Sequence, residues 1–121
     1  MKFGTFFKYN NKMDLIQKVL DLYVITTPSA EKLIVREKEA LAYYIMYGYS
    51  RETVEDIKTA LSKNIKNGYV RTINNSLRKK GYLIQDTKNM QKNHLSEDMK
   101  MIQKEFVDND GKIYVIGFKK E

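Results

Sequence analysis

The sequence predicts a mainly α fold with a small antiparallel β wing. Apolar residues recur at helical spacing in five stretches, whereas only residues 82–86 and 112–118 have the composition of strands. Glycine or proline stands at the main breaks between these stretches. The length of 121 residues matches one domain, and the 42% content of hydrophobic residues is enough to build its core.

The first helix is expected over residues 13–25, where Asp14 suits the positive end of the helix dipole. Its apolar face consists of Leu15, Ile16, Val19, Leu20 and Tyr23. Pro28, the only proline, marks the break that follows. A second helix is expected over residues 33–47 and ends at Gly48. Its inward residues are Leu41, Tyr44 and Ile45, and its solvated face carries Arg36, Glu37, Lys38 and Glu39.

Two further helices are expected over residues 51–62 and 66–80. Ser50 is a candidate N-cap for the first of them, whose apolar stripe is Val54, Ile57 and Leu61. The second points Val70, Ile73 and Leu77 inward and ends at Gly81 as a left-handed cap.

The predicted strand 82–86 follows Gly81 directly. A fifth helix is expected over residues 95–106 after a Ser96 cap, with Leu95, Met99, Ile102 and Phe106 on one face. A turn signal then precedes the predicted strand 112–118. Because residues 87–112 would separate the two strands, we expect them to form a helical insertion. The expected organisation is an N-terminal aromatic arm over residues 1–12 and a single domain over residues 13–121.

Two short helices, a Gly-terminated helix and a strand follow one another in the order of a helix-turn-helix with a wing. The segment LIVREKEALAYYIMYGYS is similar to the opening signature of LuxR-type and sigma-factor region 4 domains. The segment YVRTINNSLRKKGYLI resembles the recognition helix and first wing strand of MarR-like winged helices. The resemblance covers about fifty residues, 33–83, and implies a winged helix-turn-helix that binds DNA.

The net charge of +7 is concentrated in one part of the chain. Residues 63–104 hold ten basic and three acidic residues, while the flanking segments are close to neutral. A localised basic face is typical of nucleic-acid binders, because neutralising phosphates supplies much of their affinity. A lysine-rich solvated surface would give the same count, and the charge alone leaves both interpretations open.

The outward face of residues 67–80 has the chemistry of a DNA-reading helix. Asparagine can pair with adenine, arginine with guanine, and serine or threonine with phosphate or a base edge. The candidate contacts are Asn67, Tyr69, Arg71, Thr72, Asn75, Ser76 and Lys79. The same residue types are also common on a helix face that meets only water.

Basic residues beside this helix are candidates for positioning the DNA backbone. Arg78, Lys79 and Lys80 end the helix and would contact phosphates, although they would also offset its dipole. Lys88 and Lys92 would lie on the wing insertion and follow the phosphates of an adjacent groove.

The residue content argues against catalysis and against a metal or cofactor site. The chain has no cysteine and one histidine, His94, which is expected in a loop before the fifth helix. Glu37, Glu39, Glu52, Glu55 and Asp56 are interpreted as solvated charges. Phosphate-binding glycine motifs are absent from the sequence, and its apolar runs are too short for a membrane span. We expect a cytoplasmic, non-enzymatic protein.

Aromatic residues outside the predicted core suggest a protein partner or a homo-oligomer. The arm carries Phe3, Phe6, Phe7 and Tyr9, which either pack back on the domain or dock onto a partner. Tyr43 and Tyr47 belong to a tyrosine-rich helix with more hydroxyl groups than a small core can satisfy.

The function expected from these features is non-catalytic binding of double-stranded DNA by a transcription regulator or accessory factor. The alternative is a structural component of a larger assembly, such as a tailed-phage head-to-tail or neck protein of the virion. It would use the same scaffold for protein contacts.

Overall fold

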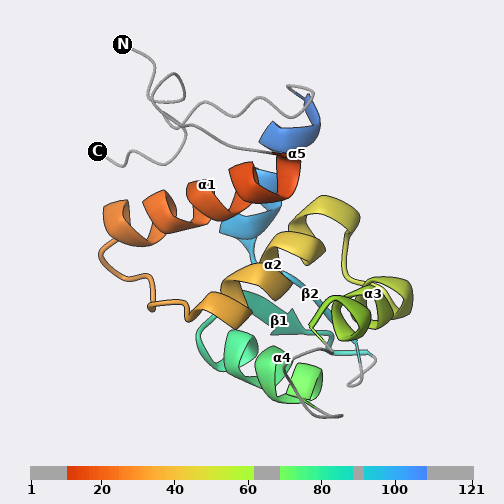
Figure 1. Ribbon diagram of the computed structural model, residues 1–121. Helices are drawn as coiled ribbons and strands as arrows, with labels where there is room; N and C mark the ends of the chain where they lie inside the picture. Colours follow the sequence, from red (N-terminus) through yellow and green to blue (C-terminus); the bar gives the residue numbers. More distant parts are fainter. Residues whose placement is uncertain (1–10, 62–68, 89–91, 109–121) are drawn as a thin grey trace.

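The computed structural model describes residues 11–61, 69–88 and 92–108. These residues form five helices and one β-hairpin, so the expectation of a mainly α chain with a small antiparallel sheet is confirmed (Figure 1). The elements are α1 (Lys12–Thr26), α2 (Val35–Tyr47), α3 (Arg51–Leu61), α4 (Tyr69–Lys79), β1 (Leu83–Gln85), β2 (Asn93–Leu95) and α5 (Glu97–Asp108). None of these helices is both long and apolar enough to cross a lipid bilayer.

Helices α1 and α2 begin with different capping arrangements. Asn11 caps α1 by accepting the backbone N–H of Asp14 at 2.9 Å, and all five residues of the predicted apolar face are buried. Helix α2 begins two residues later than predicted, after Ile34, which has no side-chain acceptor. The Glu37 carboxylate instead accepts the Ile34 N–H at 3.0 Å.

Helices α3 and α4 keep the predicted caps and, except for the partly buried Val54, the predicted core residues. Ser50 caps α3 by accepting the Thr53 N–H at 3.1 Å, and Ile57 and Leu61 are buried beneath it. Helix α4 buries Val70, Ile73 and Leu77. The helix ends at Lys79 and is followed by Gly81, whose φ of 88° is the left-handed conformation that glycine adopts without steric cost.

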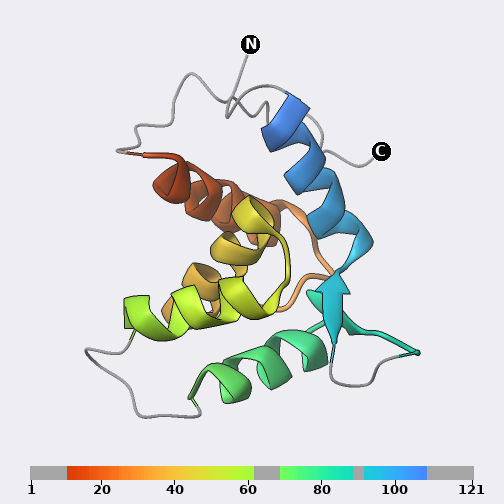
Figure 2. The same ribbon diagram turned by 90° about the vertical axis from the view of Figure 1, so that its right-hand side faces the viewer.

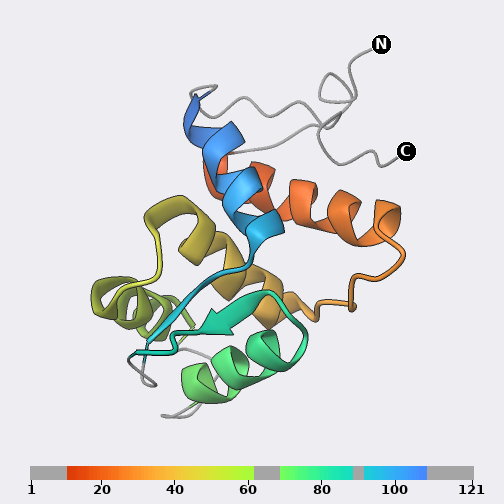
Figure 3. The same ribbon diagram turned by 180° about the vertical axis from the view of Figure 1, so that it is seen from behind.

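The partner of β1 differs from the sequence prediction. Strand β1 pairs in antiparallel register with β2, so that Leu83 lies opposite Leu95 and Gln85 opposite Asn93. The expected helical insertion 87–112 therefore contains the second strand of the hairpin, and α5 follows the hairpin (Figure 3). His94, expected in a loop, lies in β2. The predicted strand 112–118 lies outside the described residues.

Helix α2 is the centre of the fold, because α1, α3, α4 and α5 all pack against it. Helix α4 lies beside β1 at one end of the molecule, and α1 lies toward the opposite end (Figures 1 and 2). The core between them is continuous and includes Leu95, Met99, Ile102 and Phe106, the predicted inward face of the last helix. This arrangement leaves the outer side of α4 to solvent.

Candidate nucleic-acid interface

Helix α4 has two chemically distinct faces. Its inward face packs into the core, and its outward face exposes the side chains of Arg71, Thr72, Asn75 and Lys79. No acidic residue occurs between Tyr69 and Lys79. The exposed face is therefore cationic and rich in hydrogen-bond donors.

Two side chains on this face are already oriented by a mutual contact. The Arg78 guanidinium donates a hydrogen bond from Nη2 to Asn75 Oδ1 at 2.8 Å, one helical turn away. This bond involves the amide oxygen of Asn75, and the Nδ2 group of Asn75 takes no part in it. Arg78 is half-buried, so the pair holds the guanidinium along the helix surface.

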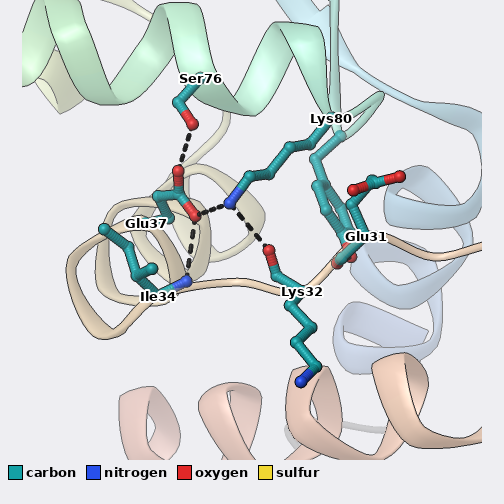
Figure 4. Close-up of polar contacts among 7 residues, drawn as sticks. Glu31, Lys32, Ile34, Glu37, Ser76 and Lys80 are labelled. Atoms are coloured by element: carbon teal, nitrogen blue, oxygen red, sulfur yellow. Dashed lines mark hydrogen bonds and ion pairs between the residues drawn. The ribbon is translucent and has the colours of Figure 1, made fainter.

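Glu37 was expected on a solvated face, and this expectation is wrong. Its side chain is buried and lies between the start of α2 and the last turn of α4 (Figure 4). The carboxylate accepts hydrogen bonds from the Ser76 hydroxyl, the Lys80 ammonium at 2.7 Å and the Ile34 N–H. Glu37 lies four residues before Leu41, so its position on the inward stripe was visible in the sequence, but its charge argued for the opposite face.

The environment of Glu37 keeps its carboxylate ionised. Burial raises the pKa of this group, but the hydrogen bonds from Lys80, Ser76 and the Ile34 N–H outweigh burial and hold the pKa below its usual value. The positive charge of Lys80, the residue after the C-terminal end of α4, balances the negative charge of Glu37. The carboxylate therefore adds no net repulsion against an anionic ligand on the outer face.

The predicted contact residues Ser76 and Lys80 have partners within the fold. Lys80 Nζ also donates to the backbone carbonyl of Lys32 at 2.8 Å, so it ties α4 to the connection between α1 and α2. The Tyr82 hydroxyl reinforces the same connection by donating to the Glu31 carbonyl at 2.5 Å. Burial, followed by the charges of Glu31 and Glu37, raises the pKa of Tyr82 to about 12.

The hairpin supplies two further exposed cations at the same end of the molecule. Lys88 and Lys92 are both exposed and flank the turn that joins β1 to β2. Asp86 shapes the start of this turn, because its carboxylate accepts the Lys88 N–H at 2.7 Å and its own N–H donates to the Lys92 carbonyl at 2.8 Å. These two hydrogen bonds link Asp86 to the backbone of both lysines.

The other predicted contacts are only partly described. Asn67 and the arm residues Phe3, Phe6, Phe7 and Tyr9 lie outside the described residues, as does the side chain of Tyr69. Tyr43 is half-buried and its ring centroid lies 6.1 Å from that of Tyr47, whose side chain is 59% exposed. The neighbouring Tyr44 and Tyr49 instead form hydrogen bonds inside the fold.

Sequence reasoning missed Asn74, which is buried on the inner side of α4. It follows Val70 by four residues and precedes Leu77 by three, so helical spacing places it on the inward face. Its amide chemistry favoured the solvated face instead.

No group of three or more histidine, cysteine or carboxylate residues among the described positions is arranged to hold a metal ion. Comparison with protein-family models, curated proteins and solved structures finds no match.

Proposed function

We propose that the protein is a non-catalytic winged-helix protein that binds double-stranded DNA, as a transcription regulator or accessory factor. The observation that carries the proposal is the exposed face of α4. It combines Arg71, Thr72, Asn75 and Lys79 on a helix without acidic residues and anchored by a buried inner face. Helix α4 would enter the major groove, which is wide enough for an α-helix.

The side chains on this face divide into two roles. Arg71 and Asn75 lie four residues apart on one side of α4 and are the candidates for base edges, because each can form two hydrogen bonds with one base. The Asn75 oxygen has a second lone pair for this pairing beside its bond to Arg78. Lys79 and the hairpin residues Lys88 and Lys92 carry point charges and would contact phosphates. The hairpin would then act as the wing beside the groove.

The proposal is tested by measuring duplex DNA binding over a salt series. We expect the logarithm of the affinity to fall linearly with the logarithm of salt concentration. Arg71→Ala with Asn75→Ala should reduce the preference for a selected DNA sequence over other sequences. The difference in binding free energy should fall by about 1–3 kcal/mol for each bidentate contact between a side chain and a base that is removed. Lys12→Ala is the matched loss of one positive charge on α1, at the opposite end of the molecule, and should leave binding unchanged.

Absence of binding at low salt would overturn the proposal. So would an equal loss from Lys12→Ala and Arg71→Ala, because binding would then follow total charge rather than the α4 face.

A structural role in a larger assembly, such as the neck of a tailed phage, is the second candidate. It is favoured by the adjacent rings of Tyr43 and Tyr47, which leave an aromatic surface on α2. If this candidate holds, the protein forms a concentration-dependent oligomer in sedimentation experiments, and Tyr47→Ala weakens it. A protein that stays monomeric at all concentrations and binds DNA would argue against it.

A further inference from the structure

A polar cluster lies behind the two elements that carry the proposed DNA contacts. The Tyr49 hydroxyl oxygen accepts a hydrogen bond from Asn93 Nδ2 at 3.1 Å and a longer one from Asn74 Nδ2 at 3.4 Å. Asn74 Oδ1 in turn accepts the Tyr44 hydroxyl at 2.7 Å. The cluster joins α4, β2, α2 and the connection between α2 and α3.

These groups are withdrawn from water. Tyr44, Asn74 and Asn93 are buried, with exposed fractions of 0%, 9% and 6%. Asn93 Oδ1 is buried without a hydrogen-bond partner among the described residues. A buried amide group that loses its hydrogen bond destabilises the folded protein. The bond from Asn93 Nδ2 to the Tyr49 hydroxyl therefore strongly favours one position of the Asn93 side chain.

The cluster connects segments that the chain does not connect directly. Strand β1 follows α4 through Gly81, whereas β2 is joined to α4 by its pairing with β1, by the shared core and by the hydrogen bonds at Tyr49. Asn74 precedes the exposed Asn75, and Asn93 follows the exposed Lys92. The buried residues thus stand next to the residues that would touch DNA.

We infer that Tyr49 is a positioning residue whose hydroxyl fixes the hairpin relative to α4. The Tyr49 ring is placed independently of its hydroxyl, because its centroid lies 4.7 Å from that of the buried Tyr44. The substitution Tyr49→Phe therefore keeps the ring packing and removes only the oxygen that Asn93 and Asn74 share.

The inference is tested without DNA by amide hydrogen exchange of the folded protein. In Tyr49→Phe, the hairpin amides of Asp86 and Ser96 should exchange about tenfold faster, because the hairpin opens locally when this bond is lost. Amides in the middle of α1 should change much less. The control Tyr47→Phe removes a hydroxyl group from an exposed ring, and it should leave the exchange rates of the hairpin and of α1 as in the wild type.

Equal acceleration in α1 and the hairpin would overturn the inference, because Tyr49 would then support overall stability alone. Unchanged hairpin exchange would overturn it as well. If Tyr49→Phe does not fold, Asn93→Ala decides the same question, since it removes only the hairpin side of the bond and keeps the contact between Tyr49 and Asn74.

A second readout rests on the proposed function. A double-mutant cycle combines Tyr49→Phe with the pair Lys88→Ala and Lys92→Ala. The two lysine substitutions should reduce DNA affinity less in the Tyr49→Phe background than in the wild type, because a displaced hairpin no longer places these lysines near phosphates. Additive losses would overturn the positioning role in binding. If the wild type binds no DNA, the proposed function fails, and the exchange experiment alone decides the role of Tyr49.

Discussion

Glu37 shows how one charged residue becomes part of a helix junction. Its carboxylate accepts three hydrogen bonds from two segments that are far apart in the sequence, at the start of α2 and the end of α4. These bonds replace the water that the carboxylate loses on burial. The residue therefore ties the end of α4 to the start of α2, in addition to the apolar contacts that hold α4 on the core.

We expect Glu37→Gln to destabilise the protein by about 1–3 kcal/mol near neutral pH, because the Lys80 ammonium loses its charged partner. The lowered pKa of Glu37 means that its contribution is complete above the ordinary value of 4.5 and is lost as the pH falls through the lower folded-state value. The stability difference between wild type and variant should thus narrow on acidification. Urea unfolding at several pH values measures it.

The control for this prediction is Glu55→Gln, which breaks an exposed ion pair with Lys58 and should cost less than about 1 kcal/mol. A Glu37 variant as stable as the wild type at neutral pH, or a difference that widens on acidification, would contradict the assigned role.

At the scale of elements, the sequence predicted what depends on local periodicity. Helices α1 to α4 were recognisable because their apolar residues repeat at three and four, and Ser50, Gly48 and Gly81 mark their ends. Strand β2 was missed because three residues, Asn93–Leu95, are too short to show alternation, and their pairing with β1 is a tertiary contact. Leu95 was rightly expected to be buried, but it belongs to β2 and not to the helix after it.

Gly81 controls the passage from α4 into the hairpin, and Gly81→Ala should cost roughly 1–2 kcal/mol. An added Cβ would meet no atom within 4 Å, so the cost comes from the φ of 88° and not from a clash. Gly81→Asn should cost less, since asparagine tolerates this conformation better. Thermal or urea unfolding measures both variants, and an alanine variant that is no less stable than the asparagine variant would contradict the assignment.

At the scale of the whole molecule, the basic segment of the sequence resolves into exposed and internal charges. Arg71, Lys79, Lys88 and Lys92 are exposed, as a solvated or DNA-facing surface requires, whereas Lys80 is bound to Glu37. Helical spacing places Lys80 three residues after the inward Leu77, but the sequence could not show that Glu37 lies there to receive its charge. The exposure of the outer α4 face was predictable from its helical spacing, and the polar partners behind it were not.

The distribution of exposed charge predicts a salt response that depends on location. A plot of the logarithm of DNA affinity against the logarithm of salt concentration has a negative slope. Lys88→Ala with Lys92→Ala should reduce the magnitude of this slope by about 2, because each lysine that neutralises a phosphate contributes about 1 to it. Lys12→Ala with Lys18→Ala on α1 removes the same charge and should leave the slope unchanged. Equal slopes for the two double variants would show that the hairpin lysines do not contact phosphates. Fluorescence anisotropy at several salt concentrations gives both values.

The bond between Lys80 and Glu37 also has a consequence for chemical labelling. The Lys80 amine donates to a buried carboxylate and to the Lys32 carbonyl, so its acylation would require both bonds to break. Amine-reactive reagents should therefore modify Lys79 readily and the adjacent Lys80 slowly. Lysine footprinting can then distinguish these neighbours, and protection of Lys79 would report on occupancy of the α4 face with little background from Lys80.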